Sequence, residues 1–382
     1  MSLLEKIKQQ IEQQPDKSIS FYEYMQLALY QPEEGYYSRA RNKIGKAGDF
    51  YTSVSVGSVF GEVLAHSFAE MIEGQSGHKP WYLVEFGGGT GDLTYQILSE
   101  WEKSFPQLVE EVQVILIEKS PFHRQLQQDK LEGFKVQWFE SWESVGEQLG
   151  SINGVVFSNE LVDAFPIWLL EYQNQTWKEV RVGWEPGKDQ LVETLEDISS
   201  PDLLNYIQRE GKYIPKMNGY RVEVNLDAQK WLKSVIKGLD QGYLITIDYG
   251  YKREELYLPQ RKRGTLLCYH QHLASENPLE TPGEKDITTH VHFSLLMEEG
   301  SELGLHNLGY FTQRQYLMNG GILQRLQEHQ ETDPFHGLNS KRNRAIRQLI
   351  MPGGMGDTFK VLVQAKGSVN KELDCLKLKG WV

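Results

Sequence analysis

The order of hydrophobic and polar positions predicts alternating strands and helices in the first half of the chain. Short apolar runs at 81–86, 112–118, 134–139 and 154–160 have the length and composition of buried strands. Longer stretches between them, such as "LTYQILSEWEKSF", repeat their apolar residues at the spacing of a helix. Strands and helices that alternate in this way build parallel βαβ units, so we expect an α/β fold with a doubly wound sheet.

The pattern changes after Pro166. Residues 167–225 alternate as an antiparallel meander does, with a turn near Pro186–Gly187, and we interpret them as an insertion beside the sheet. A helix over 227–239 and a strand over 242–250 resume the earlier rhythm. A long polar segment follows at 251–289, and "FKVLVQAK" near the end of the chain is predicted to be the last strand.

These changes suggest four segments. They are an N-terminal helical segment with an active-site loop (1–75), the first half of the sheet (76–166), an inserted β-rich subdomain (167–225) and the second half of the sheet (226–382).

Composition narrows the class of protein. The chain has 382 residues, 40% of them hydrophobic and 24% charged, and these fractions are typical of a soluble globular protein. Its formal net charge of −12 disfavours nucleic acid or an anionic membrane as a partner. The N-terminus has no secretion-signal pattern, no apolar run approaches the roughly 20 residues of a membrane span, and Cys268 and Cys375 lie far apart. We therefore expect a cytoplasmic protein with reduced thiols.

The stretch "VEFGGGTGDL" is a glycine-rich turn between a strand and a helix. Such a turn lets a backbone approach a ligand without interference from Cβ atoms. A phosphate-binding P-loop would end in Gly-Lys-Ser/Thr, but Gly91-Asp92-Leu93 stands there. A dinucleotide fingerprint would need its third glycine at Asp92, whose negative charge would also repel a pyrophosphate.

The remaining pattern, acid-x-G-x-G-x-G, suits a nucleoside ligand without phosphate. It consists of Glu85, Gly87, Gly89 and Gly91, and Glu118 ends the next apolar strand. Carboxylates attract the ammonium and sulfonium cations of S-adenosylmethionine, and Glu118 can accept hydrogen bonds from both ribose hydroxyls. A purely structural glycine turn with Glu85 as a solvated strand end is the alternative.

Several motifs together resemble the MidA-like class I methyltransferases, whose eukaryotic members are mitochondrial complex I assembly factors. They are "GDFYTS", "VEFGGGTGDL", "NELVDAFP" and "DITTHV", spread over most of the chain. The resemblance implies a seven-stranded sheet with a reversed last strand, S-adenosylmethionine as cofactor, and methylation of a protein arginine. Family members typically have Pro-Glu after the Thr-Ser of "GDFYTS", whereas this chain has Val54-Ser55, and the difference bears on the acceptor side.

An arginine acceptor would need carboxylates, because a guanidinium stays protonated in water. Asn159 closes the fourth predicted strand, and we expect it to line the cofactor and acceptor pocket together with Glu160. Glu160 and Asp163 stand three residues apart, so a helical turn ending before Pro166 would place both on one face and one would grip the guanidinium. In the alternative, Asp163 is a helix-start charge and Glu160 a surface residue.

Other polar residues are candidates for the acceptor side. Asp49, with Phe50 and Tyr51, could close over the site or simply pack in the core. Asp248 ends the fifth strand at the same edge, and His290 is a candidate for acceptor contact or proton relay. A zinc site is disfavoured, because methyl transfer to nitrogen needs no metal and no cysteine accompanies the histidines His270, His272, His290 and His292.

The sequence thus favours an S-adenosylmethionine-dependent methyltransferase acting on arginine side chains of a protein of unknown identity. No metal, nucleic acid or membrane partner is expected, and a homodimer is left open. Two alternatives remain: a non-catalytic assembly scaffold that binds its partner through 167–225, and a methyltransferase for a small molecule.

Overall fold

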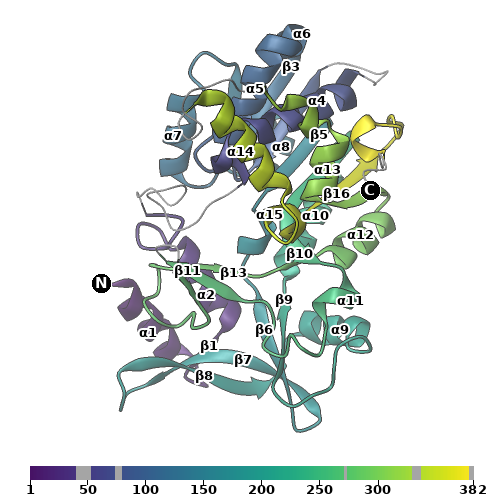
Figure 1. The fold of residues 1–382 in the computed structure, drawn as a ribbon. Coiled ribbons are helices and arrows are strands. Elements are labelled where there is room, and N and C mark those ends of the chain that lie inside the picture. The colour runs from purple at the N-terminus through teal and green to yellow at the C-terminus, as the bar shows by residue number, and fades with distance from the viewer. Residues whose placement is uncertain (40–52, 74–79, 271–272, 329–336, 378–382) are drawn as a thin grey trace. The chain divides into compact units, whose positions relative to one another are not determined.

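The computed structural model describes residues 1–39, 53–73, 80–270, 273–328 and 337–377. The chain divides into two compact units, each built from three stretches of sequence (Figure 1). Among the described residues, no helix has the length and apolar character to cross a membrane. Unit 1 comprises 1–50, 162–230 and 250–294, and unit 2 comprises 51–161, 231–249 and 295–382.

Unit 2 contains the large sheet that the strand-helix alternation predicts. Along its main path the strands are ordered β15-β16-β10-β5-β2-β3-β4; off this path, the short strand β14 pairs with the last two residues of β10, and this pair belongs to unit 1. Only β16 runs antiparallel to its neighbours on that path, so the expected seven-stranded sheet with a reversed last strand is confirmed. The bounds are β2 (Trp81–Phe86), β3 (Val112–Ile117), β4 (Val136–Phe139), β5 (Ile152–Asn159), β10 (Leu239–Tyr251), β14 (Val291–His292), β15 (His306–Thr312) and β16 (Phe359–Lys366).

The central strands are apolar because both faces of the sheet are covered. All six residues of β2 are buried, as expected for a parallel strand between two helical layers. Phe68 of α4 packs on Phe157 of β5 with their ring centroids 5.0 Å apart, and Trp101 of α5 donates its indole N–H to the Ala65 carbonyl at 2.8 Å. The helices here are α3 (Ser53–Val56), α4 (Val59–Glu73), α5 (Asp92–Ser104), α6 (Pro106–Glu111), α7 (Pro121–Lys130), α8 (Trp142–Leu149), α10 (Leu226–Gly238), α12 (Phe293–Glu302), α13 (Gln313–Asn319), α14 (Leu338–Ile350) and α15 (Met355–Thr358).

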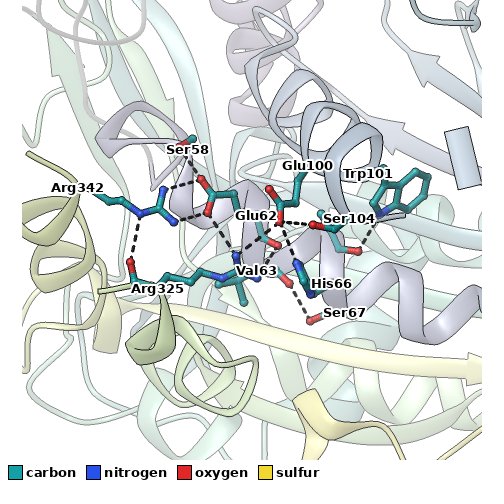
Figure 2. A network of polar contacts seen from close by, with 11 residues as sticks. Ser58, Glu62, Val63, His66, Ser67, Glu100, Trp101, Ser104, Arg325 and Arg342 are labelled. Carbon is teal, nitrogen blue, oxygen red and sulfur yellow. Dashed lines mark hydrogen bonds and ion pairs between the residues drawn. The ribbon is translucent and has the colours of Figure 1, made fainter. Parts of the chain in front are cut away.

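A partly buried network of ion pairs joins helices from the two ends of unit 2 (Figure 2). The Glu62 carboxylate on α4 accepts two hydrogen bonds from the Arg342 guanidinium on α14, at 2.8 and 2.6 Å. Arg325, in the short helix η2 (Ile322–Arg325), lies 3.4 Å from the same carboxylate. Glu100 on α5 bonds His66 at 3.0 Å. These contacts tie the segment after 53 to the last third of the chain.

Unit 1 contains the antiparallel sheet expected for the 167–225 region. Its strands β1 (Ser18–Ser20), β6 (Trp168–Gln173), β7 (Thr176–Glu185), β8 (Gln190–Asp197) and β9 (Tyr220–Val224) all pair in antiparallel register. The N-terminal helices α1 (Leu3–Gln13) and α2 (Phe21–Tyr30) pack on this sheet through a shared apolar core. The N-terminal segment also contributes a strand, β1, which the sequence pattern did not reveal.

The polar segment 251–289 is partly ordered into strands rather than being simple loop. β11 (Leu267–His270) pairs antiparallel with β12 (Leu273–Ser275) and with β13 (Asp286–Thr288). Each strand has four residues or fewer, which is too short for an alternating pattern to stand out in the sequence. Helices α9 (Pro201–Glu210) and α11 (Arg253–Leu256) complete the regular elements of this unit.

Candidate cofactor and active site

The candidate site lies at the carboxyl edge of the sheet in unit 2. Phe86, the last residue of β2, pairs with Ile117 of β3 and with Ser158 of β5. Asn159 of β5 in turn pairs with Ile247 of β10. Because these strands are parallel and in register, the polar residues that follow or close them meet along one edge.

The glycine loop takes a backbone path that side chains would disfavour. Gly87, Gly89 and Gly91 all have positive φ values, of 66°, 52° and 80°. A Cβ on Gly87 would lie 2.8 Å from the Leu161 side chain, and one on Gly91 would lie 3.2 Å from Gln127. Gly91 is also the N-cap residue of α5. The first N–H groups of a helix have no hydrogen-bond partner within the helix. The glycines are therefore required by the local fold as well as by access to a ligand.

Glu85, the second-last residue of β2, carries a buried carboxyl that is 3% exposed. The Thr94 hydroxyl on α5 donates a hydrogen bond to it. Burial raises the pKa of Glu85 to about 7, and the nearby Glu118 and Asp92 also raise this pKa while the hydrogen bonds from Thr94 lower it. A cation bound beside this carboxyl would stabilise its ionised form.

Glu118, directly after β3, is oriented by hydrogen bonds to its backbone and to its carboxylate. Its backbone N–H donates to the Phe139 carbonyl at 2.9 Å. Its carboxylate accepts from the Ser120 N–H at 2.8 Å and from the Gln127 amide at 3.2 Å, one bond on each oxygen. A carboxylate has about four acceptor positions, so this one can still accept from two hydroxyls. Burial raises the pKa of Glu118, and its remaining acceptor positions suit a ribose with free 2′ and 3′ hydroxyls.

Asp92 lies in the first turn of α5 and is held by two partners. The Thr90 hydroxyl donates to its carboxylate at 2.5 Å, and the Lys130 ammonium on α7 forms an ion pair with it. Lys130 therefore offsets part of the charge that we expected to repel a pyrophosphate. The argument against a dinucleotide consequently depends more on the missing third glycine than on this charge.

Asn159 and Glu160 lie together at the end of β5, where the Asn159 amide donates to the Glu160 carboxylate at 3.2 Å. Glu160 has a φ of +54°, a left-handed conformation that is uncommon for a residue with a side chain. The turn that follows, η1 (Val162–Ala164), is a short 3-10 helix that begins after Glu160. The expected helical turn with Glu160 and Asp163 on one face is therefore wrong, because Glu160 lies outside the helical conformation.

Asp248 on β10 holds this strained connection in place. It is fully buried, and its carboxylate accepts hydrogen bonds from the backbone N–H groups of Leu161 at 3.2 Å and Tyr249 at 2.9 Å. The Glu160 N–H donates to the Ile247 carbonyl at 2.9 Å. Strain of about 1–3 kcal/mol persists only where surrounding contacts impose it, and such positions cluster at functional sites.

Two other predicted acceptor-side residues belong to unit 1, and a third lies outside the described residues. Asp163 and His290 are part of unit 1, where the Asp163 carbonyl accepts a hydrogen bond from the Thr289 N–H at 3.0 Å. The His290 ring lies 5.0 Å from the ring of Tyr251. Asp49, Phe50 and Tyr51 lie outside the described residues.

Two further site residues escaped the sequence-based prediction. Thr94 and Gln127 are both fully buried and bond the two carboxylates of the site. As for metals, the described part of the chain contains no group of three or more His, Cys, Asp or Glu placed to bind one. His272, one of the four histidines considered for zinc, is outside that part.

Curated relatives cover most of this chain at modest identity. A Danio rerio protein named protein arginine methyltransferase NDUFAF7, mitochondrial, is 28% identical, with 89% of this chain and 82% of the relative covered. A Drosophila melanogaster protein named as its homolog is 25% identical, with 94% and 84% covered. These relatives are labelled mitochondrial, and this contradicts the expectation of a cytoplasmic protein. That expectation rested on the N-terminal pattern, on the lack of a long apolar run and on the two separated cysteines.

Solved structures and a family profile agree with the site's chemistry. A Burkholderia thailandensis protein crystallised with S-adenosyl-homocysteine superposes with a TM-score of 0.85 at 28% identity, covering 98% of this chain and 94% of that one. The cofactor expected from the glycine loop and Glu118 is therefore confirmed as S-adenosylmethionine. The profile of S-adenosyl-L-methionine-dependent methyltransferases matches residues 63–311, more than half of the sequence. The chain belongs to this methyltransferase family.

Proposed function

We propose that this enzyme transfers the methyl group of S-adenosylmethionine to a nitrogen of an arginine side chain in a protein substrate. The observation that carries the proposal is the Glu160 carboxylate at the end of β5, on a connection bonded by the buried Asp248 and at the same sheet edge as the cofactor carboxylates Glu85 and Glu118. A guanidinium acceptor stays charged in water and needs carboxylates to orient it and to receive its proton. The names of the relatives support the same acceptor.

On the cofactor side, each group has a distinct task. Glu118 accepts from the ribose hydroxyls, and Glu85 balances the positive charge of the methionyl part. Gly87, Gly89 and Gly91 keep the loop free of side chains, and Asn159 contributes its amide at the end of β5. When bound, S-adenosylmethionine supplies a methyl group on a positively charged sulfur.

On the acceptor side, Glu160 is the group that we assign to the guanidinium. The acceptor nitrogen would form a bond to the methyl carbon while the methyl–sulfur bond breaks and its electron pair stays on sulfur, and the nitrogen would lose one proton to the Glu160 carboxylate, which passes it to water. Glu160 attracts the cation and orients the attacking nitrogen, while Asp248 fixes the backbone that presents Glu160. We also assign Asp49, Asp163 and His290 to the acceptor side, to be tested by single substitutions.

The test is methyl transfer into a lysate of the source cells. Purified enzyme and lysate are incubated with S-adenosylmethionine that carries a deuterated methyl group, and tryptic peptides are analysed by mass spectrometry. The proposal expects deuterated methyl groups on arginine nitrogens. Label on lysine, or only in the small-molecule fraction, would overturn the arginine assignment.

A Glu85→Ala variant distinguishes an enzyme from a non-catalytic scaffold. It should lose both cofactor binding in calorimetry and labelling of peptides. If the wild type binds S-adenosylhomocysteine but labels nothing, and Glu85→Ala still supports the cellular role, the chain acts as an assembly scaffold and the enzymatic proposal fails.

A further inference from the structure

Gln127 contacts three parts of the cofactor site from a helix that contains none of the predicted site residues. It lies on α7, and its side chain is fully buried. Its amide nitrogen donates to the Gly89 carbonyl at 3.0 Å and to the Glu118 carboxylate at 3.2 Å. Its amide oxygen accepts from the indole N–H of Trp138 on β4 at 3.1 Å. One side chain thereby touches the glycine loop, the residue after β3, and the next strand.

The chemistry of the three partners determines which way this amide points. An indole N–H can only donate, so the oxygen of Gln127 must face Trp138. A backbone carbonyl and a carboxylate accept, so both hydrogens of the amide nitrogen are used, one on Gly89 and one on Glu118. A flipped amide would place its oxygen against two acceptors at a fully buried position, where unpaired polar groups are costly.

We propose that Gln127 is a positioning residue that aims the Glu118 carboxylate at the cofactor ribose and couples it to the glycine loop. The proposal rests on the assignment of the ribose to Glu118. Gln127 occupies one position on one carboxylate oxygen, Ser120 occupies one on the other, and the remaining positions are left for the two hydroxyls. The Glu118 carboxylate is thus held in one orientation toward the ribose instead of rotating freely.

The packing of α7 supports this role. Gly91, at the start of α5, approaches Gln127 so closely that a Cβ would lie 3.2 Å from the Gln127 Cα and Cγ atoms. Trp138 is fixed in turn, because β4 pairs with β3 and Trp138 faces Leu116 across that pair. The amide therefore has little freedom, and its contacts set the geometry of Glu118.

The test measures discrimination for the ribose. Calorimetry compares the affinity of the full-length protein for S-adenosylhomocysteine with its affinity for the 2′-deoxy analogue. We expect wild type to prefer the ribose on the order of tenfold to hundredfold, the value of a hydrogen bond to a charged group. Gln127→Met should weaken S-adenosylhomocysteine binding on the order of tenfold and reduce the preference toward that of Glu118→Gln. In the Glu118→Gln background, Gln127→Met should change the affinity little.

Gln125→Met is the matched control, because Gln125 lies on the same helix, is exposed, and directs its side-chain amide to Asp129 on that helix at 2.8 Å. It should keep the wild-type affinity and preference. Should Gln127→Met fail to fold in a thermal melt, Trp138→Phe keeps Gln127 but removes the donor that orients its amide, and the preference should again fall. Unchanged discrimination in the folded variant overturns the role of Gln127. Unchanged discrimination in Glu118→Gln overturns the ribose assignment itself and leaves methyl transfer to be judged by peptide labelling.

Discussion

The Thr94 hydroxyl on α5 donates a hydrogen bond to the buried Glu85 carboxylate nine residues earlier in the chain. The contact joins the strand before the glycine loop to the helix after it, so the loop is closed by a side-chain bond as well as by its own backbone. It also stabilises the ionised form of Glu85, which burial alone would make less favourable.

Glu85 should make the stability of the unliganded protein fall as pH rises. Its pKa is raised from 4.5 to about 7 in the folded chain. A raised pKa contributes stability that is complete below the unfolded value and is lost as pH rises through the folded value. Glu85→Gln should remove this slope, which amounts to on the order of 3 kcal/mol between pH 4.5 and pH 8. Chemical denaturation of both proteins across that range measures the difference, and parallel pH profiles would contradict it.

Cofactor binding should release a proton from Glu85. At pH 7 about half of the Glu85 carboxyls are protonated in the unliganded protein, because the pKa is about 7. A cation beside the carboxyl favours its ionised form, so wild type should release about half a proton more than Glu85→Gln. Calorimetry in buffers of different ionisation enthalpy counts these protons. Equal proton release by the two proteins would place the cation elsewhere.

Gly91→Ala should weaken cofactor binding and lower stability. The φ of +80° costs a side chain about 1–2 kcal/mol, and the Cβ contact with Gln127 adds to this. Gly133 is the matched control, because it has a φ of +97° but a Cβ there would meet no atom of the described residues within 4 Å. Gly133→Ala should lose stability only because its backbone has a positive φ, and it should keep the affinity for S-adenosylhomocysteine. Thermal melts and calorimetry separate the two effects.

Arg342→Met should destabilise unit 2 by about 1–3 kcal/mol, because it removes the bidentate partner of the Glu62 carboxylate while Arg325 and Ser58 remain beside it. Burial would raise the pKa of Glu62, but hydrogen bonds from Arg342 and Ser58 outweigh it and leave this pKa lowered. The stability that Glu62 contributes is present above the unfolded pKa and lost as pH falls through the folded one. The deficit of Arg342→Met should therefore shrink in acid. A Glu62→Leu/Arg342→Met double variant should recover much of it, and denaturation curves test both statements.

Asp248→Asn should keep more methyl transfer than Asp248→Ala. The Asn oxygen can still accept one of the two backbone hydrogen bonds, from Leu161 or Tyr249, whereas Ala leaves both N–H groups without that acceptor. In Asp248→Ala, the connection that carries Glu160 should relax from its left-handed conformation. Rates of label transfer, with affinity for S-adenosylhomocysteine as the control, distinguish the variants. Equal rates would show that the connection does not depend on Asp248.

Local patterns were enough to place the strands and the cofactor loop. The apolar runs predicted at 81–86, 112–118 and 154–160 correspond to β2, β3 and β5, because a strand covered on both faces needs continuous hydrophobic residues. The glycines and Glu118 could be predicted from the sequence, because a phosphate-free nucleoside ligand requires a backbone without side chains and an acidic residue at fixed positions. These requirements act within a few residues of sequence.

The tertiary structure decided which ordinary polar residues belong to the site. Gln127 and Thr94 look like any polar positions of an amphipathic helix, and only the packing of α5 and α7 at the sheet edge brings them to Glu118 and Glu85. The helical turn expected at Glu160 was wrong because the backbone N–H groups of Glu160 and Leu161 donate hydrogen bonds to strand β10, far away in sequence, while Glu160 has a positive φ. The sequence determined the strands and the class of ligand through short-range patterns, whereas the orientation and ionisation of the site's carboxylates come from contacts between distant segments.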